Sequence, residues 1–207
     1  MRINAYIDGF NLYYAIRNLK DPSLKWVDLR RLCENYLQES DKLIDVYLFT
    51  AHIKYDSKDP DKKKRQKAYL EAQQSHGTKI VLGRFKSKFP FCHNCNTKYH
   101  AYEEKESDIN IALQLLEDAY EDRFDKAFVV TADTDLSSTL LRVKTLFPNK
   151  KVILLVPPLK LKESRDLISC NRWIEIKKSH IKRSLLPDKI LFNGEEIHIP
   201  QDWKVEK

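Results

Sequence analysis

Two aspartates one residue apart follow a short apolar run in the second half of the chain. Asp133 and Asp135 come directly after the run Ala-Phe-Val-Val at 127–130, and an amphipathic segment at 136–147 begins behind them. The apolar run predicts a buried strand, and parallel α/β sheets build their sites where a strand leads into a helix. Two carboxylates there suit a hard divalent cation such as Mg²⁺ or Mn²⁺. The alternative is that one aspartate only caps the helix.

A carboxylate stands at the same kind of junction near the start of the chain. Residues 3–7 predict a strand, which ends in Asp8, and residues 12–19 predict the helix that follows. An ordinary turn residue is the alternative role for Asp8. Its position repeats that of Asp133, which favours a site.

A third acid lies in the first turn of a helix predicted in the middle of the chain. Asp108 precedes Ile109 and Ala112, which belong to the apolar face of that helix. First-turn acids also suit the helix dipole, whatever else they do. We place the later acids of the helix at its solvated end: Glu117, Asp118, Glu121 and Asp122.

Strands and helices alternate along the rest of the chain. The other strands are predicted at 44–49, 79–83, 151–156 and 173–176, and the other helices at 28–37, 61–75 and 164–170. This order predicts a three-layer Rossmann-like α/β fold, a parallel sheet with helices on both faces. Right-handed crossovers would bring the ends of the first and fourth strands, and so Asp8, Asp108, Asp133 and Asp135, to one edge. Crowded carboxylates repel one another, which favours a bound cation.

Three short motifs carry these acids. They are Tyr-Ile-Asp-Gly-Phe-Asn at 6–11, Glu-Lys-Glu-Ser-Asp at 104–108 and Thr-Ala-Asp-Thr-Asp at 131–135. Together they resemble the NYN domain, a branch of the PIN-like ribonucleases, whose pattern is Asp-x-x-Asn, Lys-x-x-Asp and Ser/Thr-x-Asp-x-Asp. Ala132 stands where glycine is common in that family and Leu136 where an aromatic residue is common.

The resemblance implies a Mg²⁺- or Mn²⁺-dependent nuclease that hydrolyses RNA, either single-stranded or structured. The implied metal-binding and catalytic acids are Asp8, Asp108, Asp133 and Asp135. Asn11 would position a ligand or the scissile phosphate, Thr131 would hydrogen-bond a carboxylate or water, and Glu104 would be an outer acid. Two alternatives stay open: a non-catalytic RNA-binding or scaffold protein, and a metal-dependent phosphatase of small molecules.

The chain divides into one domain, residues 1–176, and a basic C-terminal appendage, residues 177–207, which either wraps on the domain or reaches for a partner. The domain holds an irregular insertion at 84–102 with the pair Cys92 and Cys95. A Cys-x-x-Cys pair is half of a zinc site, and His100, His93 or a residue from elsewhere in the chain would have to complete it. A redox role is less favoured, because no helix begins at Cys92.

The formal net charge of +7 and the pI near 9.1 favour a polyanionic partner. A basic run is otherwise a solvated surface. The residues expected to contact RNA are Lys62, Lys63, Lys64, Arg65, Lys67, Arg84, Lys86, Lys88, Lys177, Lys178, Lys182 and Arg183. No apolar run reaches transmembrane length and no signal-peptide pattern follows Met1, so we expect a cytoplasmic protein without a membrane partner. A homo-oligomer is left open.

Overall fold

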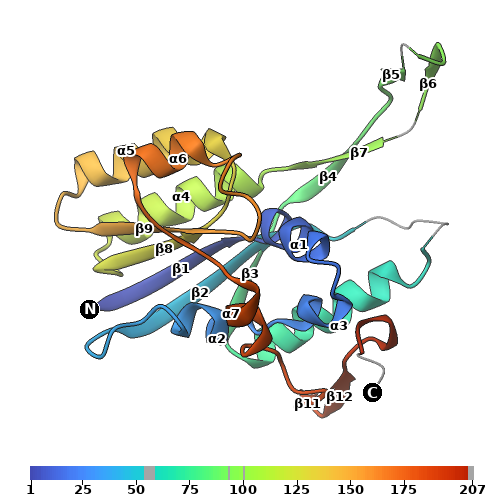
Figure 1. Cartoon of the computed structure of the whole chain (residues 1–207), viewed down its shortest axis with the longest axis horizontal. Coiled ribbons are helices and arrows are strands. Elements are labelled where there is room, and N and C mark those ends of the chain that lie inside the picture. Colours follow the sequence, from blue (N-terminus) through green and yellow to red (C-terminus); the bar gives the residue numbers. More distant parts are fainter. Residues whose placement is uncertain (54–58, 93, 100, 205–207) are drawn as a thin grey trace.

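Six parallel strands form the central sheet of the computed structural model, which describes residues 1–53, 59–92, 94–99 and 101–204. The strand order is β10-β9-β8-β1-β2-β3 (Figure 1). The strands are β1 Arg2–Asp8, β2 Lys42–Thr50, β3 Thr78–Leu82, β8 Lys126–Val130, β9 Lys151–Val156 and β10 Arg172–Glu175. The predicted parallel sheet is confirmed, and β1 and β8 are direct neighbours.

Helices cover both faces of this sheet (Figure 1). One face carries α1 Gly9–Asn18, α2 Leu29–Glu34, α3 Lys62–Ser75 and α7 Lys178–Lys182; the other carries α4 Ser107–Tyr120, α5 Ser137–Leu146 and α6 Arg165–Cys170. Alternation along β1 sends Ile3, Ala5 and Ile7 into the first core and Tyr6 into the second. The predicted three-layer fold is therefore correct. No helix in the described ranges is both long and apolar enough to cross a membrane.

Asp118 is buried in the second core, so its prediction as a solvated residue is wrong. Its side chain is fully enclosed and accepts hydrogen bonds from Asn4 Nδ2 at 3.1 Å and Tyr6 Oη at 2.7 Å. On its own side, Gln114 Nε2 and Arg123 Nη1 donate at 2.9 and 3.0 Å. A buried carboxylate needs such partners. The network ties α4 to β1, and these are the two elements that carry Asp108 and Asp8.

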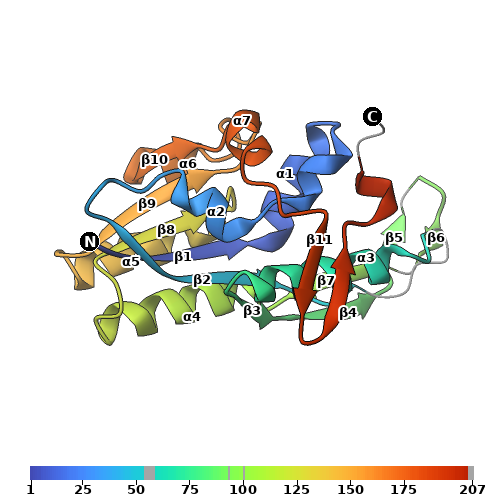
Figure 2. The same ribbon diagram turned by 90° about the horizontal axis from the view of Figure 1, so that it is seen from below.

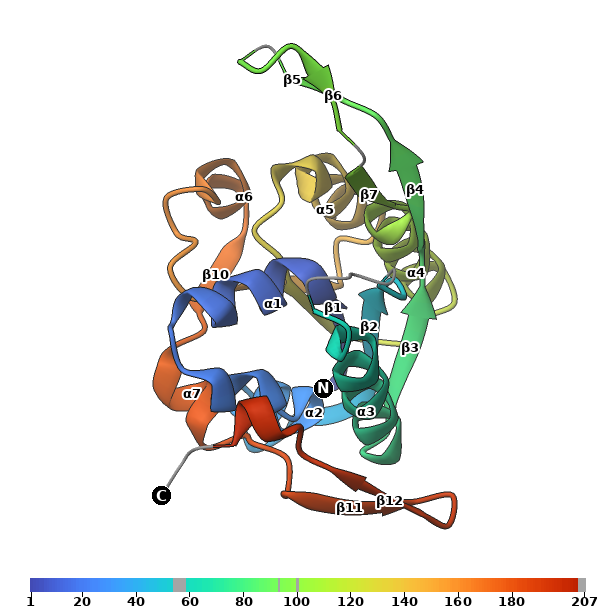
Figure 3. The ribbon, with the colours of Figure 1, turned by 90° about the vertical axis from the view of Figure 1, so that its right-hand side faces the viewer.

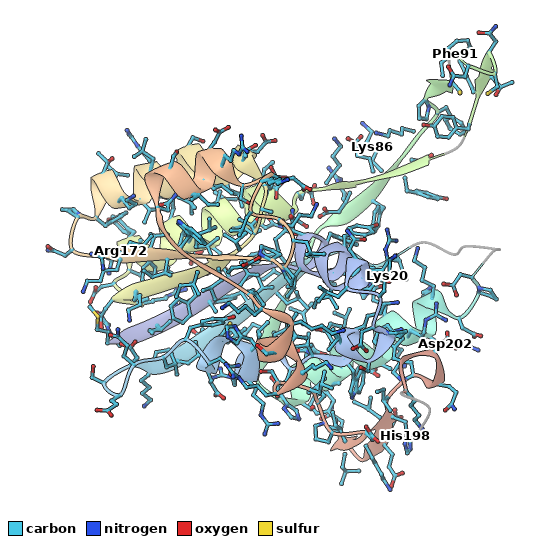
Figure 4. The ribbon with its side chains drawn as sticks, viewed as in Figure 1. Lys20, Lys86, Phe91, Arg172, His198 and Asp202 are labelled. Carbon is cyan, nitrogen blue, oxygen red and sulfur yellow. The ribbon has the colours of Figure 1, made fainter. Side chains whose placement is uncertain are left out.

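The insertion is a two-stranded ribbon that projects from the body, not the irregular segment that was predicted (Figures 1 and 4). Its strands are β4 Arg84–Lys88 and β7 Ala101–Lys105, with β5 Phe91–Cys92 and β6 Thr97–Lys98 at the tip. We call these four strands the arm. Charged residues populate both faces of the ribbon, which hides the period-two pattern by which a strand is recognised. A Cβ atom on Gly83 would lie 2.6 Å from the Lys105 carbonyl oxygen, so glycine allows the base of the arm to close.

The C-terminal segment wraps on the domain, which decides between the two roles left open. The hairpin of β11 Lys189–Phe192 and β12 Glu195–His198 packs on α3 (Figure 2). A short 3-10 turn, η3 Gln201–Trp203, then brings Trp203 against Trp26 and Tyr69, with ring centroids 6.2 and 6.1 Å apart. Arg65 Nη1 pairs with Asp202 at 2.8 Å. The segment therefore packs against α3 and the short 3-10 turn at Pro22–Trp26 that follows α1.

Candidate active site

Asp8 and Thr131 lie next to each other because β1 and β8 pair in register. Ile7 is the partner of Val130, so each strand delivers its next residue to the same point on the carboxyl edge. The Thr131 hydroxyl lies 3.2 Å from Asp8 Oδ2 and accepts from the Asp133 amide at 3.0 Å. One buried hydroxyl thus links the two strand ends, as predicted for a residue that hydrogen-bonds a carboxylate.

Asp8 caps α1 and is also buried beneath it. Its Oδ1 accepts from the Asn11 amide at 3.0 Å, and its Oδ2 accepts from Asn11 Nδ2 at 2.8 Å. Gly9 allows the close approach, since a Cβ atom there would lie 2.7 Å from the Phe49 carbonyl oxygen. The alternative for Asp8 is an ordinary turn residue; the structure makes it the cap of α1, and the cap fixes the direction of the carboxylate.

Asp133 caps the short turn η2 Thr134–Leu136, and its Oδ1 accepts from the Asp135 amide at 3.0 Å. Asp135 is exposed, whereas Asp133 is half-buried. The cap uses only one carboxylate oxygen of Asp133, so capping the turn is compatible with a role for Asp133 in binding a ligand. Both acids stay at the carboxyl edge, beside the end of β1.

Asp108 enters the site from the first turn of α4. The residue before this helix, Glu106, has a left-handed backbone with φ of 81°, which a non-glycine residue adopts at a cost of about 1–3 kcal/mol. The Glu106 side chain accepts from Arg84 Nε at 2.7 Å, and this contact joins the turn to the arm. The Ser107 hydroxyl donates to Glu104. The left-handed turn at Glu106 therefore brings Glu104, at the end of β7, close to Asp108, at the start of α4.

Burial, and after it the charge of the neighbouring acids, raises the pKa values of the buried acids in this cluster. Burial, followed by the charges of Asp8, Asp133 and Asp135, raises the pKa of Asp108 to about 6. Burial, followed by Asp8 and Asp108, raises the pKa of Glu104 to about 7. Burial also raises the pKa of Asp8, against the hydrogen bonds that it accepts. All five carboxylates therefore share one electrostatic neighbourhood.

This cluster has no neutralising partner within the protein as described. Among the described residues, no lysine, arginine or histidine forms an ion pair with any of the five. Hard oxygen donors with unbalanced negative charge fit Mg²⁺ or Mn²⁺. Within the same described ranges, no three acidic, histidine or cysteine side chains already converge on one metal position. The donor set fits a divalent ion, and side-chain rotation would have to bring the oxygens together.

The raised pKa values predict that the metal-free protein loses stability as the pH rises. Asp108 and Glu104 titrate at 3.8 and 4.5 when unperturbed and at about 6 and 7 when folded. A raised folded pKa stabilises below the unfolded pKa, and this contribution disappears as the pH passes through the folded value. Between pH 5 and 8 we expect a loss of about 2 kcal/mol, after allowance for solvent screening.

Urea unfolding in EDTA at both pH values measures this loss. Asp108→Asn should flatten the dependence, whereas Asp188→Asn, on the far C-terminal segment, should leave it unchanged. If the free energy of unfolding changed equally between pH 5 and pH 8 in Asp108→Asn and in wild type, the titrating groups would lie outside this cluster.

Sequence reasoning missed a pocket of about 620 Å³ beside these acids. It begins at Gly9 and Phe10 and is lined by aromatic and basic side chains of α1 and α3. Phe10, Tyr13, Tyr14 and Arg17 follow i, i+3, i+4, i+7 spacing, which is the signal that could have revealed one helix face.

The basic residues predicted to bind RNA do not form one surface. Lys62 and Arg65 line the pocket, while Lys63, Lys64 and Lys67 are exposed on other sides of α3. Figure 3 shows the arm, with Arg84, Lys86 and Lys88, and α7 at opposite ends of the molecule, with α1 between them. Of the exposed basic residues at 177–183, Lys178 and Lys182 lie in α7, and Lys177 and Arg183 flank its two ends.

The cysteine pair lies at the tip of the arm. Cys92 and Cys95 are free thiols and close to each other; hydrogen bonds from Thr97 and then Cys92 lower the pKa of Cys95. Cys92 ends a strand and begins no helix, as predicted. His93 and His100 lie outside the described residues, and within the described ranges no third acidic, histidine or cysteine side chain joins the pair.

Zinc at this tip stays a prediction, and elemental analysis of protein purified without added metal tests it. A structural site binds with roughly 10 kcal/mol or more, so about one equivalent should survive purification. Cys92→Ser should remove it, whereas Cys33→Ser, at a buried thiol in the core, should not. Less than about a tenth of an equivalent in the wild type would contradict a tight site.

A parallel α/β sheet with clustered acids at its carboxyl edge defines the class of protein to which this chain belongs. Residues 2–177 match the NYN domain, and the chain is a member of that family, which falls within the PIN-like nuclease superfamily. It is 28% identical over 215 residues to 6-hydroxy-3-succinoylpyridine 3-monooxygenase HspA of Pseudomonas putida, covering 87% of this chain and 67% of that protein. A protein of unknown function from Vibrio parahaemolyticus has a similar fold, with a TM-score of 0.57, 21% identity, and coverage of 89% and 96% of the two chains.

Proposed function

We propose that this protein is a Mg²⁺- or Mn²⁺-dependent ribonuclease that hydrolyses phosphodiester bonds of RNA at the carboxyl edge of its sheet. The observation that carries the proposal is the cluster of Asp8, Asp108, Asp133 and Asp135, which has no cationic partner among the described residues. Membership in the NYN family supports the same chemistry. The metal ligands would be these four aspartates.

Each side chain of the site has a task in this reaction. Asn11 and Thr131 hold Asp8 in place, so its carboxylate meets a ligand without reorganisation. Glu104, whose pKa is about 7, can hold or release a proton near neutral pH and suits proton transfer to the leaving oxygen. When bound, a divalent ion supplies a more acidic water and positive charge beside the phosphate.

Labelled RNA and single-stranded DNA, incubated with purified protein in Mn²⁺ or EDTA, test this function directly. We expect RNA to be cleaved with Mn²⁺ and to stay intact with EDTA. Intact RNA under both conditions, with a folded protein, would favour the non-catalytic RNA-binding alternative.

Binding of RNA should depend steeply on salt, because phosphate contacts release counterions with a log–log slope of about −0.7 per phosphate. A quadruple glutamine variant of Lys177, Lys178, Lys182 and Arg183 is expected to bind unrelated RNAs more weakly and with a flatter slope. Lys178 pairs with Asp21 at 3.1 Å, so circular dichroism should check that α7 stays folded. An unchanged affinity and slope would make the α7 cations a solvated surface only.

A second candidate function is oxygenation of a small aromatic acid. The relative from Pseudomonas putida is named for such a substrate, and the pocket beside Asp8 offers aromatic rings and cations of a suitable kind. Turnover of 6-hydroxy-3-succinoylpyridine with oxygen and a reduced nicotinamide would support it. RNA cleavage without such turnover would exclude it.

A further inference from the structure

One face of α1 consists of rings and a cation. Phe10 stacks on Tyr14 with centroids 6.4 Å apart, and the Arg17 guanidinium lies 4.8 Å from the centre of the Tyr14 ring. Tyr13 lies edge-on to Tyr14 at 5.5 Å. The opposite face of the helix carries the core residues of α1, so this face is turned away from the sheet. It starts at Phe10, two residues after Asp8.

Three other segments close the pocket around this face. Helix α3 contributes Lys62, Arg65 and Tyr69, which share one side by their spacing. The arm contributes Phe85, whose ring lies 5.6 Å from Phe10. The C-terminal turn contributes Trp203; Figure 4 shows Asp202, its neighbour, on this turn below α1.

Lys25 reaches into the pocket from the short turn η1 Pro22–Trp26. Its Nζ lies 5.9 Å from the Tyr13 ring centre and 6.0 Å from the Trp203 ring centre. These distances allow cation–π attraction. Burial, then the charges of Arg65 and Arg17, lower the pKa of Lys25.

The cations of the pocket are not all balanced by acids. Arg65 pairs with Asp59 and with Asp202. In the described part of the chain, Arg17, Lys25 and Lys62 have no carboxylate partner. Unbalanced positive charge beside the exposed Tyr14 ring and the partly exposed Phe10 and Tyr13 rings is complementary to a ligand that combines a planar ring with a phosphate.

We propose that this pocket binds one nucleotide of the RNA, with its base against the α1 rings beside Trp203 and its phosphate at Arg17, Lys25 and Lys62. The inference rests on the proposed nuclease function, since it names where the strand beside the cleaved bond is held. Arg17 in α1 lies nine positions after the cap residue Asp8, a rise of about 13 Å along the helix axis. A strand bound in the pocket therefore runs directly to the acids.

Adenosine 5′-monophosphate, titrated by calorimetry into the Asp133→Asn protein in EDTA, probes the pocket without cleavage. We expect Arg17→Gln and Lys25→Gln each to weaken binding about tenfold, because a phosphate partner is lost. Ribose 5-phosphate should bind about tenfold more weakly than the nucleotide, because it lacks the base that stacks. The matched control is Lys42→Gln, an exposed cation at the opposite, amino edge of the sheet.

Each outcome decides the assignment. Equal affinity of the Asp133→Asn protein with and without Arg17→Gln or Lys25→Gln for the nucleotide would overturn it, as would tighter binding of 6-hydroxy-3-succinoylpyridine than of the nucleotide. If RNA is not cleaved but the nucleotide shows the expected losses, the pocket assignment stands and the nuclease proposal fails. If RNA is cleaved and both variants keep the wild-type KM, the nuclease proposal stands and the pocket assignment fails.

Discussion

Asp133→Asn is expected to lower Mn²⁺-dependent RNA cleavage by at least about 100-fold while the protein stays folded. The asparagine keeps an oxygen that can accept from the Asp135 amide, so the η2 turn survives. It removes one of the charges that raise the pKa of Asp108 and Asp8, so the metal-free fold should become no less stable. Gel assays of labelled RNA at matched protein concentration measure the loss.

Asp188→Asn is the matched control, because it also replaces an aspartate by an asparagine. Asp188 lies just before β11, far along the chain from the acids. It should retain wild-type cleavage. Wild-type activity in Asp133→Asn, with purity established by a mock preparation, would end the catalytic assignment of the cluster.

Asp118→Ala should destabilise the protein by roughly 3–5 kcal/mol, the largest stability effect that we expect from a single charge change. The substitution leaves Asn4, Tyr6 and Arg123 without the carboxylate that they share. Tyr6 is fully buried, and its unpaired hydroxyl would keep the full desolvation penalty. Urea unfolding, with the midpoint and slope fitted together, measures the change.

Glu117→Ala is the neighbouring control, because Glu117 is largely exposed and its contact with Arg123 is 3.6 Å long. It should change the free energy of unfolding by no more than about 0.5 kcal/mol. A comparable small change for Asp118→Ala would show that the buried network contributes little. Since α4 also carries Asp108, the Asp118 variant should lose activity through misplacement of that acid as well.

The acids of the site could be predicted because their placement follows from local patterns and one topological rule. Asp8 and Asp133 each end an apolar run, and parallel pairing brings such ends to one edge. Thr131 and Glu104 were also predicted as neighbours of the acids, and the structure places both beside them. A sequence pattern cannot predict the distances between these acids and a bound ion.

Asp118 and the pocket could not be predicted because they depend on contacts between distant segments. Asn4 and Tyr6 stand 114 and 112 residues before Asp118, and an acid near a helix end is exposed by default. The ring face of α1 is visible in the spacing of Phe10, Tyr13, Tyr14 and Arg17, but its function requires walls from α3, the arm and Trp203. The arm was missed for a different reason, because Phe85 and Tyr102 are the only large apolar residues of β4 and β7, and their face also carries Ser87 and Glu104.

Trp203 lines one side of the pocket and Asp202 pairs with the lining residue Arg65, yet both lie beyond residues 2–177, the part that matches the NYN family. One wall of the pocket therefore comes from a stretch of polypeptide outside the part that carries the acids. A relative could keep every aspartate and exchange its substrate through its tail alone. Family membership thus says more about the acids of this protein than about the molecule on which they act.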